Sequence, residues 1–149
     1  MHTSVSINIA QPKEVVWQAI CDIAHSNHMI SAILAIEVLH QPRDGIIGLK
    51  WRETRKMFGK EATEVMWITD AEENQYYSTR AENHGAVYIT HLELTDVAGA
   101  SQLTMTFSMQ AQSTFAKIMG SCMGFLMQGS MKKMLYQDLV DIKKAVEQN

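Results

Sequence analysis

Hydrophobic and polar residues alternate along most of this chain and then change to a helical spacing. An alternation with a period of two residues is typical of strands that bury one face. After residue 113 there is no proline, and apolar residues recur every three or four positions, which predicts one long helix from Phe115 to Glu147. The alternation predicts strands over residues 3–10, 33–40, 49–58, 60–69, 75–82, 86–95 and 103–111.

Two short helices are predicted between the first and second strands. Pro12 suits the first position of the first helix, because that position needs no backbone N–H donor. The second short helix is predicted over Ser26–Ala32. Short polar connections between the strands imply antiparallel neighbours, and one apolar face per strand implies a sheet covered on one side. We therefore predict one α+β domain over residues 1–149, in which a curved seven-stranded antiparallel sheet wraps around the long C-terminal helix.

Composition and charge indicate which classes of binding partner are not expected for this chain. The chain is 46% apolar and 19% charged, which is typical of soluble globular proteins. Its formal net charge of −3 gives no electrostatic reason to expect nucleic acid or acidic lipid as a partner. The N-terminus shows no secretory signal, and the near-apolar run over residues 118–127 is too short to cross a bilayer. We expect a cytoplasmic protein with no transmembrane segment.

Methionine is unusually frequent, with eleven residues against four phenylalanines. Methionine is unbranched and adaptable, and it recurs on surfaces that accept varied ligands. The last predicted strand places Leu103, Met105, Phe107 and Met109 on the face that meets the long helix. A face built only for packing would favour branched aliphatic side chains. We therefore predict a cavity between sheet and helix.

Charged residues are predicted to share this interior. If Phe58-Gly59 forms a two-residue turn, Glu53 pairs with Glu64 across the hairpin, and the face that carries Trp51 also carries Arg55. A register error of one residue would instead leave the three charged side chains on the solvated face. Inside the cavity, the two carboxylates and the guanidinium could neutralise each other, hold the polar end of a ligand, or perform acid/base chemistry.

We favour Arg55 as the polar anchor of a ligand. A buried guanidinium must be paired, and its remaining N–H groups could hold a carboxylate or a carbonyl. On this hypothesis Arg55→Ala weakens binding by about 2 kcal/mol and leaves the fold intact. Glu53 and Glu64 are the first candidates for catalytic acid/base residues, followed by Glu82 and Tyr88. The predicted ligand-binding residues are Trp51, Glu53, Arg55, Glu64, Met66, Tyr88, Met105, Phe107, Met109, Ile118 and Cys122.

No metal or cofactor is predicted. The six histidines lack ligand spacing, and neither a Gly-rich phosphate loop nor a nucleophile elbow is present. His84, at a predicted hairpin tip, is either a solvated loop residue or a contact at the mouth of the cavity. Cys21 and Cys122 have no spacing suited to metal or redox chemistry, so we expect structural roles for both.

The first half of the long helix is apolar almost all round, so it should bury two faces. It also contains Gly120, Gly124 and Gly129, which weaken a helix by about 1 kcal/mol each. One face would cover the cavity. The other, with Met123 and Met127, would meet a second copy of the chain if the protein forms a homodimer.

The chain resembles the SRPBCC superfamily, which includes START-like and birch-pollen-allergen-like proteins. Within that superfamily it is most similar to the bacterial polyketide cyclase/dehydrase and lipid-transport branch. The resemblance rests on residues 12–17 with Asp22, and on residues 48–55, 58–64, 84–85, 103–107 and 138–143. It implies a helix-grip fold over nearly the whole chain, and a cavity that serves enzymes in some members and carriers in others.

Three hypotheses follow for function. The first is binding or transport of a hydrophobic small molecule, such as a lipid or a polyketide-like compound, which requires only a cavity and one polar anchor. The second is a cyclase or dehydratase that uses the same cavity, which requires a positioned acid/base group. The third is an interaction domain whose apolar helix docks on a protein partner.

Overall fold

The computed structural model describes residues 2–83, 85–111 and 114–148, and between residues 114 and 127 it describes only the course of the helix. Seven strands precede the long helix, as the alternation predicts. The elements in chain order are β1 (His2–Ile9), α1 (Lys13–Cys21), the 3-10 helix η1 (Ile23–His28), β2 (Ile33–His40), β3 (Lys50–Met57), β4 (Lys60–Glu72), β5 (Tyr76–Asn83), β6 (Ala86–Val97), β7 (Ala100–Ala111) and α2 (Thr114–Glu147).

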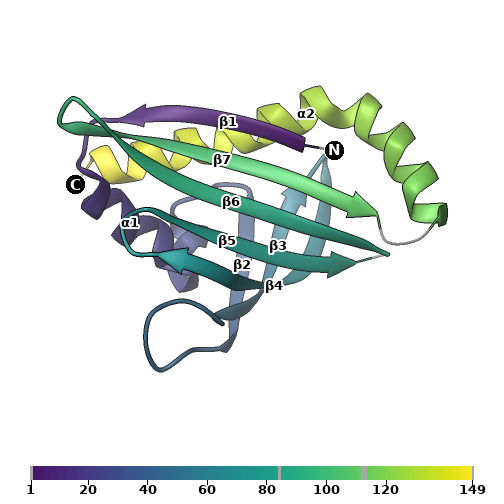
Figure 1. The fold of residues 1–149 in the computed structure, drawn as a ribbon, viewed down its shortest axis with the longest axis horizontal. Helices are drawn as coiled ribbons and strands as arrows, with labels where there is room; N and C mark the ends of the chain where they lie inside the picture. The colour runs from purple at the N-terminus through teal and green to yellow at the C-terminus, as the bar shows by residue number, and fades with distance from the viewer. Residues whose placement is uncertain (1, 84, 112–113, 149) are drawn as a thin grey trace.

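The strands form one sheet in the order β1-β7-β6-β5-β4-β3-β2, and all neighbouring pairs are antiparallel. The helix α2 runs along one face of this curved sheet, and α1 lies at the end where α2 terminates (Figure 1). The long helix contacts β1, β7 and α1. The predicted architecture, a seven-stranded antiparallel sheet around a C-terminal helix, is therefore confirmed.

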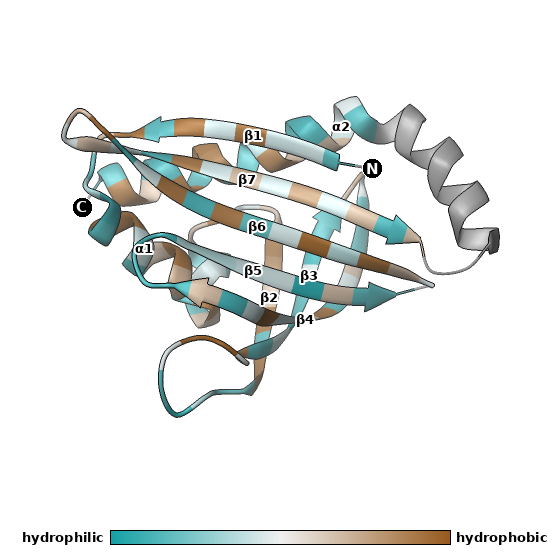
Figure 2. Ribbon diagram, in the orientation of Figure 1, coloured by the Kyte–Doolittle hydropathy of each residue, from teal (hydrophilic) through white to brown (hydrophobic). Residues whose placement is uncertain are grey.

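The closest packing lies where the C-terminal half of α2 meets the sheet. Leu135, Leu139, Ile142 and Val146 follow one another at three- or four-residue spacing and are all buried. Apolar and polar residues alternate along β6 and β7, as Figure 2 shows, so each strand offers one apolar face to the helix. Branched aliphatic side chains fill this region, and Leu103 of β7 has no exposed surface.

The hairpin between β3 and β4 has the predicted register. Trp51 pairs with Met66, and Glu53 pairs with Glu64. Phe58 and Gly59 form the turn with φ angles of 52° and 81°. Both angles lie in the left-handed region that a two-residue hairpin of this kind requires. The register places alternate residues of β3, beginning with Trp51, on the concave side of the sheet.

Several boundaries differ by one to four residues from those predicted, and the largest differences are at β4, β7 and η1; β7 begins at Ala100 instead of residue 103. The strand β4 continues to Glu72, so the turn predicted over residues 70–74 is shorter, and a register shift between Ile68 and Asp70 accommodates the polar residues within the strand. The second short helix is η1, which begins three residues earlier than predicted. Beyond the end of η1, the backbone N–H and hydroxyl of Ser31 both donate to Asp141 on α2, at 2.8 and 2.7 Å.

Candidate functional site

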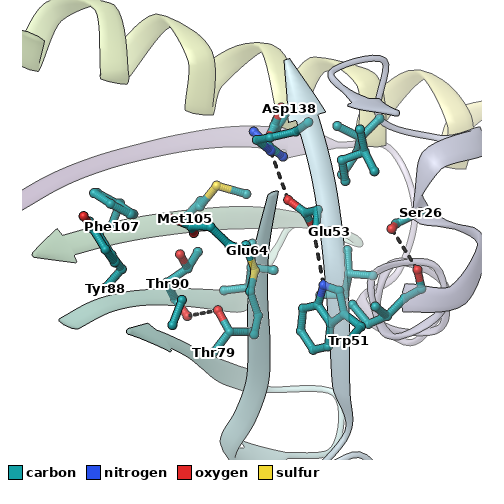
Figure 3. A pocket seen from close by; sticks show the side chains of 18 of the residues that line it. Ser26, Trp51, Glu53, Glu64, Thr79, Tyr88, Thr90, Met105, Phe107 and Asp138 are labelled. Carbon is teal, nitrogen blue, oxygen red and sulfur yellow. Dashed lines mark hydrogen bonds and ion pairs between the residues drawn. The ribbon is translucent and has the colours of Figure 1, made fainter. Parts of the chain in front are cut away.

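A cavity of about 150 Å³ lies on the concave side of the sheet. Its wall is formed by side chains from α1, η1, every strand from β2 to β7, and the C-terminal half of α2. Figure 3 shows the side chains of Tyr88, Phe107 and Met105 at one side and those of Ser26 and Trp51 at the other. The sheet, the short helices and the long helix therefore all border this partly open cavity.

The structure brings most of the predicted site residues to this wall. Met109, which lies beyond Phe107 on β7 and pairs with Tyr88, is not among the described lining residues. Ile118 and Cys122 lie outside the residues whose side chains are described. The predicted residues that line the cavity are Trp51, Glu53, Arg55, Glu64, Met66, Tyr88, Met105 and Phe107.

Flexible and aromatic side chains make up much of the apolar wall. Met57, Met66 and Met134 are all partly buried and border the cavity from three different elements. The rings of Tyr88 and Phe107 are stacked, with centroids 6.0 Å apart. Methionine, which is unbranched and flexible, adapts to ligands of different shape better than branched side chains do.

A buried ionic cluster interrupts this apolar wall. The Nε of Arg55 donates to Oε2 of Glu53 at 3.0 Å, and an Nη of Arg55 donates to Oδ2 of Asp138 at 2.9 Å. The indole N–H of Trp51 points at the other oxygen of Glu53 from 3.4 Å. Figure 3 shows Glu53 between Trp51 and Asp138. The side chains of Arg55, Glu53 and Asp138 are only 12%, 9% and 5% exposed.

The chain positions these groups by simple periodicities. Glu53 and Arg55 are two residues apart on β3, so both point to the concave face. Asp138 lies one helical turn before Ile142 on the buried stripe of α2. The ion pair between Arg55 and Asp138 therefore ties β3 to the long helix, and the ion pair between Arg55 and Glu53 lies within β3.

Burial and the neighbouring charges both shift the pKa values of Asp138 and Arg55. Burial raises the pKa of Asp138 above its ordinary value, and Arg55 opposes this shift without cancelling it. For Arg55, burial would lower the pKa, but Asp138 and Glu53 together raise it, so the guanidinium stays charged. One cation is thus shared between two buried acidic groups.

Asp138 is the principal site residue that sequence reasoning missed. It is not among the ligand-binding residues that the sequence predicts. Its spacing does carry a signal, because it lies three residues after Leu135 and four before Ile142, which are both buried. A polar residue in that position of a buried stripe requires a partner, and Arg55 supplies one.

The remaining acidic candidates separate into two environments. Glu64 lines the cavity and is half-buried, and it contributes, after burial, to the raised pKa of Tyr88. Glu82 lies on the other face of the sheet, where it is exposed and forms an ion pair with Arg80 at 2.8 Å. Glu82 is therefore not a residue of this cavity.

Histidine and cysteine contribute little chemistry to the described part of the chain. No group of three or more metal-binding side chains was found among the described residues. His91 accepts or donates a hydrogen bond with the Ser78 hydroxyl at 2.7 Å, away from the cavity, and His84 lies outside the described residues. Burial, with a smaller effect of Glu73, raises the pKa of the Cys21 thiol to about 12, so this thiol is unreactive. The Cys122 side chain is not described.

Among the described residues, no helix is both long enough and apolar enough to span a bilayer.

The family model for polyketide cyclase/dehydrase and lipid transport matches residues 1–147. No curated protein sequence gave a match.

Solved structures share the fold over nearly the whole chain. TTHA0849 from Thermus thermophilus is 15% identical with a TM-score of 0.79, and the match covers 98% of this chain and 97% of that one. The Zhui aromatase/cyclase from Streptomyces sp. R1128 is 13% identical with a TM-score of 0.77, covering 99% and 93%. A START superfamily protein from Mycobacterium smegmatis is 14% identical with a TM-score of 0.70, covering 98% and 94%. At these identities the likeness concerns the fold alone.

Proposed function

Because the chain belongs to the polyketide cyclase/dehydrase and lipid transport family, we propose that it binds or carries a hydrophobic small molecule in the cavity between sheet and α2. Family membership indicates hydrophobic ligand binding or polyketide cyclase/dehydrase activity. The single observation that carries the proposal is an apolar cavity with one ionic cluster in its wall. Small-molecule sites typically combine a mostly apolar lining with a few polar groups that fix orientation.

The energetic cost of the cavity supports this function. Protein interiors are normally close-packed, and a void lined by apolar side chains forfeits dispersion contacts and hydrophobic stabilisation. Here a partly open cavity of about 150 Å³ lies in the same interior as fully buried residues such as Leu103 and Leu139, which do not line it. A chain that can fill one part of its interior so completely has a reason to leave the other part hollow, and ligand binding is such a reason.

The Glu53–Arg55–Asp138 cluster would orient the ligand. It is the most polar part of a wall that is otherwise mostly apolar, so an amphipathic ligand would direct its polar end toward it. The ion pairs also change what we expect of Arg55→Ala. Removing the guanidinium leaves two buried carboxylates without their cation, so this variant should lose stability as well as ligand affinity.

A variant that fills the cavity gives a cleaner test. Ala81 lines the cavity and is buried, so the side chain in Ala81→Phe would occupy space that the ligand needs. Ala35 is exposed on the edge strand β2, so Ala35→Phe makes the same chemical change outside the cavity. Binding is measured by fluorescence titration with N-phenyl-1-naphthylamine, a neutral apolar dye that becomes bright when it leaves water.

We expect wild type and Ala35→Phe to bind the dye equally and Ala81→Phe to bind at least about tenfold more weakly. Thermal unfolding of each variant establishes that it is folded. If Ala81→Phe perturbs the fold, Thr90→Phe fills the same cavity from β6. Equal binding by a folded, cavity-filled variant and the wild type would show that the dye binds elsewhere, and the proposal would be wrong.

A second candidate function is cyclase or dehydratase chemistry in the same cavity. The observation that favours it is the pair Glu53 and Glu64, which lie directly opposite each other on β3 and β4 and both line the cavity. Two carboxylates that face one bound molecule can act on it as general acid and general base. The test is incubation with a linear poly-β-ketone surrogate followed by mass spectrometry. A carrier returns the compound unchanged, whereas an enzyme yields a product lighter by one water, and Glu64→Gln should suppress that product.

A further inference from the structure

The ionic cluster has more hydrogen-bond acceptors than the donors that reach it. Glu53 and Asp138 are two carboxylates, and each oxygen of a carboxylate accepts two hydrogen bonds. The interactions they receive within the cluster come from two N–H groups of Arg55 and, at the long distance of 3.4 Å, from the indole of Trp51. The cluster therefore has acceptor capacity to spare.

Asp138 shows this excess most directly. Its Oδ2 is paired with Arg55, but its Oδ1 is buried and has no hydrogen-bond partner among the described residues. The residue is 3% exposed and contributes to the cavity wall. Buried polar atoms in native proteins are nearly always hydrogen-bonded, and an orphan oxygen of a charged group is among the most costly exceptions. The other orphan atom in the described part, Oγ1 of Thr3, belongs to a residue that does not line the cavity.

The charge balance of the cluster points in the same direction. One guanidinium opposes two carboxylates, so the buried group carries a net negative charge when all three are ionised. A ligand carboxylate placed beside it would add a second uncompensated negative charge in a poorly solvated site. A hydroxyl or an amine would bring a donor to the free acceptor without that repulsion. This reverses the expectation, made from the sequence, that Arg55 holds a carboxylate or a carbonyl.

We infer that the Glu53–Arg55–Asp138 cluster selects ligands whose polar end is a hydrogen-bond donor, a hydroxyl or an amine, and rejects ligands that end in a carboxylate. The inference rests on the proposed function, because it names the class of molecule that the cavity accepts. The ion pair of Asp138 with Arg55 keeps Oδ2 engaged, so the donor group of the ligand would complete the hydrogen bonding of the other oxygen after a small adjustment of the carboxylate.

Four naphthalene derivatives of similar size test this selection. The donor is 2-naphthol, its apolar isostere is 2-methylnaphthalene, the neutral acceptor is 2-acetonaphthone, and the carboxylate is 2-naphthoate. Their affinities for the full chain are measured at pH 7.5 by displacement of N-phenyl-1-naphthylamine and by calorimetry. We expect 2-naphthol to bind on the order of tenfold more tightly than 2-methylnaphthalene, as a hydrogen bond to a charged group warrants, and 2-naphthoate to bind most weakly.

Variants at Asp138 test whether this residue causes the preference for ligands with a hydrogen-bond donor. Asp138→Leu removes the acceptor and leaves Glu53 and Arg55 as a balanced pair, so the preference for 2-naphthol over 2-methylnaphthalene should fall to about twofold or less. Asp138→Asn keeps the size and removes the charge, so the discrimination against 2-naphthoate should shrink in that variant even if Asp138→Leu fails to fold. Lys133→Leu, an exposed position on the same helix, should keep both preferences.

The outcomes separate this inference from the proposed function. If none of the four compounds displaces the dye and none binds by calorimetry, the proposed function itself is wrong for ligands of this size. If 2-naphthol and 2-methylnaphthalene bind equally well to the wild type, the cavity binds apolar molecules but the selection is wrong. Tightest binding of 2-acetonaphthone would show that the cluster donates a hydrogen bond to the ligand, which also overturns the inference.

Discussion

The two ends of β7 contact the interior in different ways. Near its start, Leu103 is fully buried and belongs to a close-packed region with Ile9 of β1 and Leu139 of α2, all three at 0% exposure. Farther along the same strand, Phe107 is only partly buried and lines the cavity. The residue types change with the environment, from branched aliphatic to methionine and aromatic side chains. One strand therefore contributes to two regions. We call the region of Ile9, Leu103 and Leu139 the packed end, and the cavity region that Phe107 lines the hollow middle.

This difference separates stability from binding within a single core. Filled interior space stabilises the fold through dispersion and burial, whereas hollow space costs stability and accepts a ligand. The two regions are adjacent on α2, since Asp138 of the cavity wall directly precedes Leu139 of the packed end. Substitutions at the packed end should change stability first, and substitutions at the hollow middle should change binding first.

The largest effect should come from Leu139→Ala. This side chain is completely buried, so its removal leaves a new cavity and should lower the free energy of unfolding by about 3–5 kcal/mol. Met66→Ala, at the cavity wall, enlarges a space that already exists and should cost only about 1 kcal/mol. Urea denaturation of both variants measures the contrast. Similar losses in the two would mean that the interior is uniformly packed and that the comparison fails.

Arg55→Ala should have the next largest effect. Removing the cation leaves two buried carboxylates without their counter-ion. We expect the free energy of unfolding to fall by about 2–4 kcal/mol, which is less than for a fully buried pair because the guanidinium is partly exposed. The double variant Arg55→Leu with Asp138→Leu should recover part of this loss, because only one carboxylate is then left without a partner. If the double variant is no more stable than Arg55→Ala, the ion pair to Asp138 is not what holds this region together.

Asp141 connects the segment before β2 to α2, and it should make the stability of the fold depend on pH. Burial would raise its pKa, but the hydrogen bonds from Ser31 and Gln137 outweigh this effect and lower it. A lowered pKa in the folded state means that the stabilisation is present at neutral pH and is lost as the pH falls below about 4. Asp141→Asn should therefore cost about 1 kcal/mol at pH 7, and the difference from wild type should shrink toward pH 3. Thermal unfolding across that range would contradict the assignment if the difference stays constant.

The smallest effect is expected at Phe58, which is exposed and does not line the cavity. Its φ of 52° lies in the left-handed region, where a bulky residue is strained and asparagine is well tolerated. Phe58→Asn should stabilise the fold by a few tenths to about 1 kcal/mol and leave dye binding unchanged. Chemical denaturation measures the first quantity and fluorescence titration the second. A loss of stability would show that Phe58 makes packing contacts that outweigh the strain.

Sequence patterns predicted the fold more completely than the site. The order of elements and the β3–β4 register follow from local rules, namely the period of two and the two-residue turn at Phe58-Gly59. The second short helix was predicted to begin three residues later than η1 does, and the contact of Ser31 with Asp141, which is 110 residues away in sequence, cannot be read from a local pattern. Arg55 was identified from its strand, but its partner Asp138 comes from a distant helix, and the excess of acceptors became visible only when the two were brought together.

The most direct test of the central claim is mass spectrometry of the protein purified without denaturation. If the hollow middle is a binding site, the native wild-type protein should carry an additional mass, and solvent extraction should release the same hydrophobic compound with a hydroxyl or amine group. Ala81→Phe should be purified without it, and Ala35→Phe should retain it. Wild-type protein that shows only its own mass, even after incubation with a lipid extract, would contradict the claim that the cavity exists to hold a ligand.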